Sequence, residues 1–262
     1  MLVIGELING MYKAVGKAIT ERDKKTIQKI AKDQVKQGAG MLDVNTGPYE
    51  KKPKDAMKWL VETIQAVTDV PLALDSTKSD VIEEGLKVVK KKAMINSTNA
   101  DEEKLATILA LVIKYKTSMI GLTMGKSGVP RDKNERMEHA VKIITKCQEA
   151  KLDINDLYLD PIVLPVNVAQ AQGVEVLDSI REFKLLCDPA PKTVIGLSNA
   201  SQSTKERPLI NRTYLVMAIA NGLSAAILDP LDKDLMDAAI TAELVLNKNI
   251  YCDSFLSAYK KR

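Results

Sequence analysis

The sequence is poor in the residues that mark several common classes of protein. It has one histidine, one tryptophan and two phenylalanines, and its three cysteines, Cys147, Cys187 and Cys252, are far apart. Cysteines that are few, odd in number and widely spaced predict reduced thiols in the cytoplasm rather than a disulfide framework or a zinc site. The N-terminus has no basic region followed by a small-residue cleavage site, so we expect no signal peptide.

Long apolar runs and strong net charge are also missing. The longest apolar candidate, residues 215–228, is interrupted by Asn221 and Gly222 and is shorter than the roughly 20 residues that cross a bilayer. A net charge of +4 is too small to indicate a nucleic-acid-binding surface, and the basic clusters at 90–92 and 260–262 are expected to be solvated. We therefore expect neither a membrane nor a nucleic acid as partner.

The chain does contain a regular alternation of short apolar runs with longer segments of helical period. The runs cover residues 2–8, 41–46, 71–76, 93–97, 119–124, 157–163, 193–199 and 225–229. Their apolar residues are continuous rather than alternating with polar ones, as is typical of parallel strands that are covered on both faces. Eight such units without a dividing linker predict an α/β fold, a single (β/α)8 TIM barrel over residues 1–262. A doubly wound open sheet is the alternative.

The segments between the runs carry apolar residues on one face. Asp23 is expected to cap the first of these helices. Farther along, Met137, Val141 and Ile144 are expected to face the core, which places His139 on the opposite, solvated face. Without an available histidine, Ser-His and Cys-His catalysis and histidine-rich metal sites are disfavoured, and we expect no metal site in this chain.

Polar residues end nearly every run. They are Glu6, Asn9, Asp43, Asn45, Asp75, Ser76, Asn96, Ser97, Thr123, Lys126, Asp160, Ser198, Asn199 and Asp229. Turn and cap formation explains any one Asp, Asn or Ser, but it explains four aspartates at run ends less well. Pro161 also disfavours a helix cap at Asp160. Because barrel active sites lie at the carboxyl ends of the strands, this ring of Asp and Asn suits a neutral, nitrogen-rich heterocycle.

Several of these strand ends form motifs that occur together in a fixed order. They are LDST at 74–77, INSTN at 95–99, YLDP at 158–161, GLSNAS at 196–201, RPLINRT at 207–213 and YCDSF at 251–255. Over essentially the whole chain this pattern resembles the pterin-binding barrel family, which includes dihydropteroate synthases and folate-dependent corrinoid methyltransferases. The resemblance is strongest to the methyltetrahydrofolate:corrinoid/iron-sulfur protein methyltransferases of the acetyl-CoA (Wood-Ljungdahl) pathway.

The branches of this family differ at the seventh and eighth strands. Dihydropteroate synthases have a lysine near the end of strand seven and an Arg-x-His pair after strand eight, whereas this sequence has Asn199 and Leu228-Asp229-Pro230. The folate module of methionine synthase continues its seventh motif with Ser-Phe, whereas this sequence has Ser201-Gln202. That module also belongs to a much longer chain, so the corrinoid/iron-sulfur branch is the better match.

The resemblance implies 5-methyltetrahydrofolate as substrate and a set of residues that bind it. These are Asp75, Asn96, Asp160, Asn199, Gln202 and Arg207. The first three would hydrogen-bond the edge of the pterin ring, and the last two, on the loop after the seventh strand, would reach the benzoyl-glutamate tail. Asn199 would face the methyl-bearing nitrogen, and together with Asp160 it is the expected catalytic residue.

The same resemblance implies a macromolecular partner. The corrinoid (cobalamin) that exchanges the methyl group would be carried by a corrinoid/iron-sulfur protein, so this chain itself would hold no cobalt, and a homodimer is expected.

Three alternatives remain open: a pterin-barrel methyltransferase that serves another corrinoid protein or free cobalamin, a non-catalytic barrel that docks a corrinoid protein, and an aldolase that works through Lys126. The direction of transfer and the general acid also stay open.

Overall fold

The eight predicted runs are the strands of a closed parallel barrel in which each strand pairs with its neighbours in chain order. The computed structural model describes residues 1–252. The strands are β1 (Leu2–Asn9), β2 (Met41–Asn45), β3 (Leu72–Asp75), β4 (Met94–Asn99), β5 (Ser118–Leu122), β6 (Leu157–Asp160), β7 (Lys192–Gly196) and β8 (Ala225–Leu228). The TIM-barrel prediction is confirmed, because a closed sheet excludes the open, doubly wound alternative.

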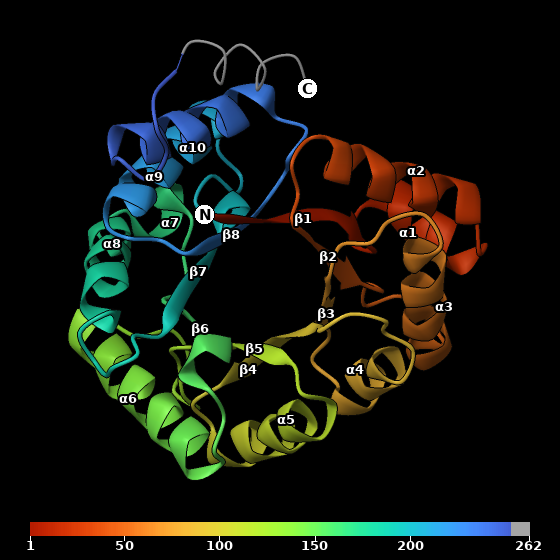
Figure 1. Ribbon diagram of the computed structural model, residues 1–262, viewed down its shortest axis with the longest axis horizontal. Helices are drawn as coiled ribbons and strands as arrows, with labels where there is room; N and C mark the ends of the chain where they lie inside the picture. The colour runs from red at the N-terminus through yellow and green to blue at the C-terminus, as the bar shows by residue number, and fades with distance from the viewer. Residues whose placement is uncertain (253–262) are drawn as a thin grey trace.

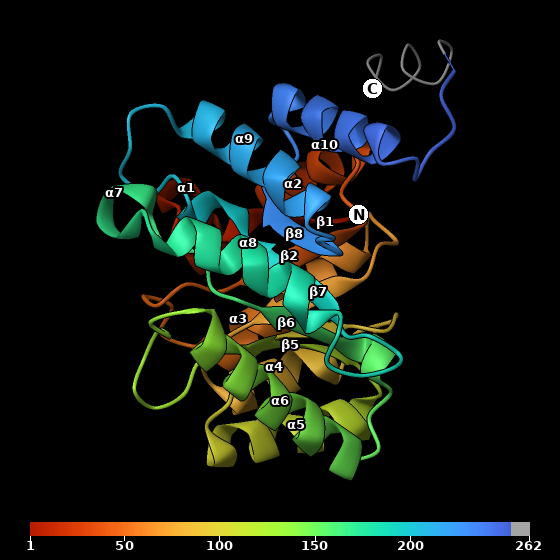
Figure 2. The same ribbon diagram turned by 90° about the vertical axis from the view of Figure 1, so that its left-hand side faces the viewer.

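Helices form an outer ring around this barrel and follow the chain clockwise in Figure 1. They are α1 (Lys13–Thr20), α2 (Lys24–Lys36), α3 (Pro53–Gln65), α4 (Ser79–Leu86), α5 (Glu102–Tyr115), α6 (Lys133–Glu149), α7 (Val166–Ala169), α8 (Gln172–Phe183), α9 (Arg207–Ala220) and α10 (Lys233–Val245). Figure 2 shows α7 at the opposite end of the barrel from the N-terminus. None of the helices within residues 1–252 is both long and apolar enough to span a membrane.

Two sequence predictions involve residues beyond those that the structure describes. Residues 253–255 of the YCDSF motif and the basic cluster 260–262 lie outside the described residues. The assignment of residues 253–262 to the same domain as the barrel therefore stays a prediction.

Each strand is buried on two sides because its side chains alternate between the barrel interior and the helix layer. One set of strand residues forms a cluster separate from the main core and fills the interior. It consists of Ile4, Met41, Ala73, Met94, Ile120, Tyr158, Val194 and Ala225. The strands therefore read as unbroken apolar runs in the sequence although they have two faces.

Two details of the sequence prediction are wrong. The seventh strand ends at Gly196, and Leu197–Asn199 form a short 3-10 turn rather than the end of the strand. On α6, Val141 is 47% exposed, while His139 is half-buried and lies against Gly125. The core-facing side of α6 instead includes Arg136, which is fully buried. Met137 and Ile144 pack against the core as predicted, so among the expected core residues named above the hydrophobic spacing is wrong only at Val141; it could not indicate a buried charged residue such as Arg136.

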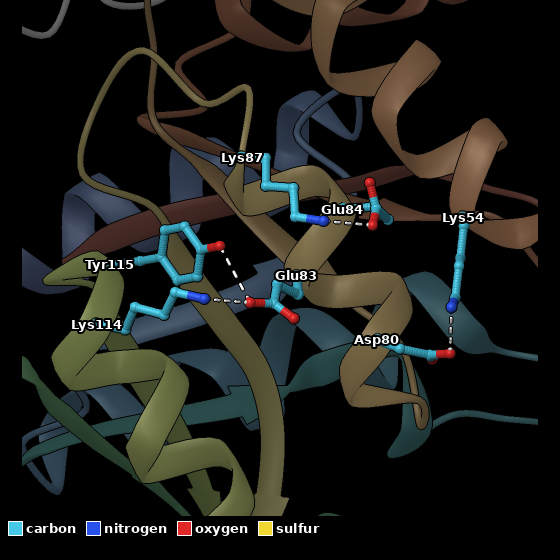
Figure 3. Close-up of polar contacts among 7 residues, drawn as sticks. All are labelled: Lys54, Asp80, Glu83, Glu84, Lys87, Lys114 and Tyr115. Carbon is cyan, nitrogen blue, oxygen red and sulfur yellow. Dashed lines mark hydrogen bonds and ion pairs between the residues drawn. The ribbon is translucent and has the colours of Figure 1, made fainter.

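Polar contacts on the outer surface join helix α4 to its neighbours (Figure 3). Lys54 of α3 lies 2.8 Å from Asp80 of α4, and Lys114 of α5 lies 2.7 Å from Glu83. Exposed ion pairs of this kind stabilise a fold only weakly. The position of α4 therefore depends mainly on its buried residues, among them Gly85, whose missing side chain lets the helix approach Leu74 and Met57.

The β1–α1 and β2–α3 loops touch through two glycines at the carboxyl end of the barrel. Gly47 has φ +79°, and a Cβ placed there would lie 2.7 Å from the Gly10 carbonyl carbon. The close approach fixes the loop next to Asn45, whose Oδ1 accepts a hydrogen bond from the Gly47 N–H at 2.7 Å.

We predict that Gly47→Ala destabilises the protein because it combines a left-handed backbone with a backbone clash. The left-handed conformation alone costs a β-carbon-bearing residue about 1–2 kcal/mol. Gly128→Ala is the matched control, because Gly128 also has positive φ (+95°) but has nothing within 4 Å of the added Cβ. Urea denaturation of both variants should show the larger loss of unfolding free energy for Gly47→Ala; equal losses would contradict the proposed clash.

Candidate functional site

A polar layer lies above the apolar interior of the barrel. Since side chains alternate along a strand, the residues two positions after the interior cluster face the same side. Five of these positions are polar, namely Glu6, Asp43, Asp75, Asn96 and Asp160, whereas Leu122 on β5, Gly196 on β7 and Ile227 on β8 occupy the other three. Over two residues along the strands, the lining of the barrel interior thus changes from apolar to mostly polar. This change occurs at the carboxyl ends of the strands, where barrel enzymes have their active sites.

Strand register brings the predicted pterin residues of β3 and β4 side by side. Asp75 pairs in register with Asn96 on one side and with Asn45 on the other. The Asn45 Nδ2 donates to Asp75 Oδ2 at 2.6 Å, and the Asn96 Nδ2 donates to Asp43 Oδ1 at 2.9 Å. Two carboxylates and two carboxamides therefore form cross-strand pairs, and their remaining acceptor positions are available for a ligand.

The carboxyl groups of this layer hold protons more tightly than usual. Burial raises the pKa of Asp43 well above its ordinary range, and the negative charge of Asp75 adds to the effect. Burial also raises the pKa of Asp75, against the hydrogen bond from Asn45, which lowers it. A ligand that offers N–H donors to these groups would relieve this unfavourable burial of negative charge.

Asp160 ends β6 and is buried, with 8% of its surface exposed. Burial raises its pKa to about 7, although a hydrogen bond from the Ile162 N–H at 2.7 Å and the charge of Arg136 both lower it. A carboxyl group with this pKa is divided between its two protonation states near neutral pH. It is therefore suited to general acid–base chemistry as well as to hydrogen bonding.

Asn199 lies in the 3-10 turn after β7, where its side chain is exposed at the mouth of the barrel. Its Nδ2 stands close to Gly196, where a Cβ would come within 3.0 Å of it. Glycine at the end of β7 thus leaves room for the Asn199 amide. Gln202 is exposed in the following loop, and its backbone N–H donates to the Asn199 carbonyl at 3.2 Å.

The sequence places Arg207 on the loop after the seventh strand, but in the structure it is the first residue of α9. Its Nε donates to Ser201 Oγ at 3.2 Å and its Nη2 to the Ser198 carbonyl at 3.4 Å. Arg207, Ser198, Glu6 and Asp229 line a cavity of about 550 Å³ between β1, β8 and α9. Arg207 therefore lies toward the β1–β8 side of the mouth, away from the Asp75–Asn96 pair on β3 and β4.

Glu6 connects this cavity to the turn that carries Asn199. Its Oε1 accepts a hydrogen bond from Ser198 Oγ at 2.7 Å. Burial raises the pKa of Glu6, the charge of Asp229 raises it further, and the Ser198 hydrogen bond and Arg207 lower it. Burial also raises the pKa of Asp229.

Lys126 does not fit the role of a Schiff-base lysine. Its Nζ lies 3.3 Å from Asp101 Oδ2, and 82% of its side chain is exposed. A lysine that forms Schiff bases is usually desolvated, or lies beside another cation, so that its pKa falls. Lys126 instead lines a separate cavity of about 670 Å³ that also reaches Asp75 and Ser97.

The aspartates at strand ends differ from those that cap helices. Asp23, Asp101, Asp132 and Asp232 accept hydrogen bonds from backbone N–H groups of helix first turns. By contrast, Asp43 and Asp75 accept hydrogen bonds from side chains of other strands. Asp160 and Asp229 each accept, through Oδ1, a hydrogen bond from the backbone N–H two residues later. Turn formation thus explains part of the set, but not the carboxylates of β2 and β3.

Glu6, Asp43 and Arg136 are absent from the predicted set of binding residues. Glu6 and Asp43 stand at strand ends, and Asp43 belongs to the predicted ring of Asp and Asn, yet neither has a predicted contact with the substrate, although their two-residue spacing from Ile4 and Met41 is visible in the sequence. Arg136, considered below, gave no such signal because it lies on a helix among charged neighbours.

Residues 13–229 match the family model described as pterin binding enzyme. The whole chain is 24% identical to the methylcorrinoid:tetrahydrofolate methyltransferase of Eubacterium limosum and covers 97% of that protein. It is also 28% identical over 87% of its length to the methionine synthase of Mycobacterium tuberculosis, of which it spans only 20%.

Solved structures of similar fold include two dihydropteroate synthases. The enzyme from Coxiella burnetii, in complex with pteroic acid, has a TM-score of 0.72 at 18% identity and covers 95% of this chain and 94% of its own. The enzyme from Yersinia pestis has a TM-score of 0.68 at 18% identity, with 94% of each chain covered. At this level of identity the likeness establishes the shared fold alone.

We predict that Asp160→Asn changes the pH dependence of stability. The folded-state pKa of Asp160, about 7, lies above its ordinary value of 3.8, so the folded protein binds the extra proton between these pH values. The wild type should therefore lose stability relative to the Asn variant as pH rises from about 4 to 7, by up to roughly 4 kcal/mol. The other buried carboxyls are common to both proteins, so their titration cancels in the difference.

Urea denaturation of both proteins at several pH values measures this difference. Asp153→Asn is the control of opposite sign, because hydrogen bonds from Asn155 lower the pKa of Asp153. That variant should lose stability relative to the wild type as pH rises through the acidic range. A pH-independent difference for Asp160→Asn would show that the Asp160 carboxyl is ionised throughout.

Proposed function

This chain belongs to the pterin-binding enzyme family, and from that premise we propose that it moves a methyl group between 5-methyltetrahydrofolate and the cobalt of a corrinoid carried on another protein. The observation that carries the proposal is the polar layer at the carboxyl ends of the strands, with Asp75, Asn96 and Asp160 on its inner side. The likeness to a methylcorrinoid:tetrahydrofolate methyltransferase over the whole chain supports the methyl donor and acceptor.

The residues present fit a pterin ring. The ring offers N–H donors and lone pairs along one edge, and Asp75, Asn96 and Asp160 provide acceptors and one amide donor from three strands. The apolar interior lies directly below, with Leu122 and Ile227 packed against it. A flat heterocycle could thus be hydrogen-bonded at its edge and covered on its lower face by apolar side chains.

The proposed chemistry requires charge to be stabilised at one nitrogen. A methyl group does not leave a tertiary amine unless that nitrogen gains positive character, and the corrinoid, when bound, supplies the strong nucleophile that accepts the methyl. Asn199 would position the methyl-bearing nitrogen by a hydrogen bond that strengthens in the transition state. Asp160, whose pKa is about 7, would anchor the delivery of the proton.

For the benzoyl-glutamate tail, Gln202 and Arg207 remain the proposed contacts. Both are exposed at the mouth, and the Arg207 guanidinium suits a carboxylate. Arg207 also contacts the turn that carries Asn199 through Ser198. Binding of the tail would therefore act on the same turn that positions the reacting nitrogen.

The finer part of the proposal concerns the partner. The branch-specific residues, Asn199 and Ser201-Gln202, favour a corrinoid/iron-sulfur protein of the acetyl-CoA pathway as the carrier of the corrinoid. A carrier of the methionine-synthase type is the second candidate, which the 28% identity to methionine synthase favours. Transfer rates to a purified corrinoid/iron-sulfur protein, an isolated cobalamin-binding module and free cob(I)alamin would distinguish them. We also propose that this protein is a homodimer and acts in the cytoplasm.

We predict that the wild type binds methyltetrahydrofolate and that Asp75→Asn and Asp160→Ala weaken this binding. Loss of one hydrogen bond to a charged group is worth about 1.5–3 kcal/mol, which corresponds to roughly a tenfold to hundredfold rise in Kd. Calorimetric titration checks this, with Asp156→Asn, near the amino end of β6, as a control that leaves Kd unchanged. A folded wild type that binds no folate would reject the proposed function.

A second prediction separates positioning from binding. Asn199→Ala should lower kcat by roughly a hundredfold or more while changing Kd for methyltetrahydrofolate only slightly, because the hydrogen bond matters most in the transition state. Asn155→Ala, an exposed change at the other end of the barrel, is the control. A large loss of folate affinity with unchanged turnover would assign Asn199 to ground-state binding instead.

A further inference from the structure

Arg136 is a charged residue in a place where an apolar one is expected. It lies on α6 and is fully buried, facing the residue after β6 and the start of α8. Its Nε donates to the Pro161 carbonyl and its Nη2 to Gln172 Oε1, both at 2.7 Å. Within residues 1–252 no carboxylate forms a direct ion pair with it. Because burying a cation without a directly paired anion is unfavourable, an arginine here calls for a role beyond filling space.

The carbonyl that Arg136 holds belongs to a strained turn next to the site. Ile162 has φ +66°, a conformation that is rare for a β-branched residue. Its N–H donates to Asp160 Oδ1 at 2.7 Å, while the preceding carbonyl, of Pro161, accepts from Arg136. The turn is thus held from one side by the Asp160 carboxylate and from the other by the guanidinium. Strained backbone persists only where surrounding contacts determine it in this way.

The same segment continues to the turn that carries Asn199. After Ile162 the chain runs into α7, and the Val166 N–H donates to the Ala200 carbonyl at 3.0 Å. Ala200 directly follows Asn199. A contiguous set of contacts therefore links Arg136 to Asp160 and, through the β6–α7 loop, to the neighbourhood of Asn199.

The charged and titratable groups around Arg136 come from each element packed against it. They are Asp132 at the start of α6, Asp160 of β6, Glu175 of α8 and Tyr214 of α9. Glu175 Oε2 accepts from the Lys133 N–H at 2.7 Å, so it is already held in place. Burial raises the pKa of Tyr214, which keeps that group neutral, whereas the charge of Arg136 lowers the pKa of Asp160 against the effect of burial.

We propose that Arg136 is a positioning residue that fixes the Asp160–Ile162 turn, and with it the Asp160 carboxyl, for the methyl transfer proposed above. This inference rests on the proposed function for its catalytic meaning. Its structural part, the hold on Asp160, can be tested without activity.

The test compares Arg136→Met, which removes the charge and both hydrogen bonds, with Arg136→Lys, which keeps the charge but cannot reproduce the planar fork. The titration of Asp160 is followed by NMR of ¹³C-labelled aspartate carboxyls, assigned with Asp160→Asn. The pKa of Asp160 should rise in the methionine variant and stay close to the wild type in the lysine variant. In transfer from methyltetrahydrofolate, the methionine variant should lose roughly a hundredfold in kcat, as expected for a misplaced catalytic group.

The pH profile separates this role from a general loss of structure. If protonated Asp160 supports transfer, the transfer rate falls as pH rises through the pKa of Asp160. In Arg136→Met this falling limb of the pH–rate profile should move to higher pH, because the pKa of Asp160 is expected to rise. Arg181→Met, an exposed arginine on α8, is the matched control and should leave both the limb and kcat unchanged. A folded methionine variant in which Asp160 titrates as in the wild type would overturn the proposal.

Two further outcomes are decisive. If Arg136→Met does not fold, the kcat of Arg136→Lys tests the proposal. A wild-type kcat in the lysine variant would overturn it, because the two hydrogen bonds of the planar guanidinium would then be dispensable. If the wild type transfers no methyl group, the proposed function fails, whereas the NMR titration still shows whether Arg136 holds Asp160.

Discussion

The two-residue alternation of side chains in a closed barrel is the constraint on which the rest of this structure depends. Strand closure leaves an interior that must be filled, and the layer around Ile4, Met94 and Tyr158 fills it. The next inward positions then lie at the open end, where polar groups can meet a ligand. Asp75 and Asn96 lie in the polar layer because they stand two residues after Ala73 and Met94.

The same burial that shapes this layer also sets its protonation. Asp43, Asp75 and Asp160 come from separate strands, and burial raises the pKa of each. Their effects differ because their partners differ. The charge of Asp75 raises the pKa of Asp43 further, and hydrogen bonds from Asn96 and Asn45 lower the pKa of Asp43 and Asp75 respectively. For Asp160, the positive charge of Arg136 opposes the effect of burial. One side of the layer is therefore suited to accepting hydrogen bonds, and the other to exchanging a proton.

Loops after β6 and β7 join these two functions. The Asp160–Ile162 turn is fixed from outside the barrel by Arg136, and the loop that follows bonds to the backbone beside Asn199. Residues on the helix layer thus reach the mouth of the barrel through the backbone rather than through direct contact with a ligand. Such support from outside the site is how a rigid scaffold holds loop residues in place.

By itself, the sequence determined the barrel, the strand ends and the pterin-binding resemblance, because continuous apolar runs at βα spacing and ordered polar motifs are local patterns. Asp75, Asn96 and Asp160 were identifiable in this way. Only the tertiary structure decided which polar groups pair across strands, where β7 ends and that Arg136 is buried. These features depend on strand register and on packing between elements distant in sequence, and no local periodicity encodes them.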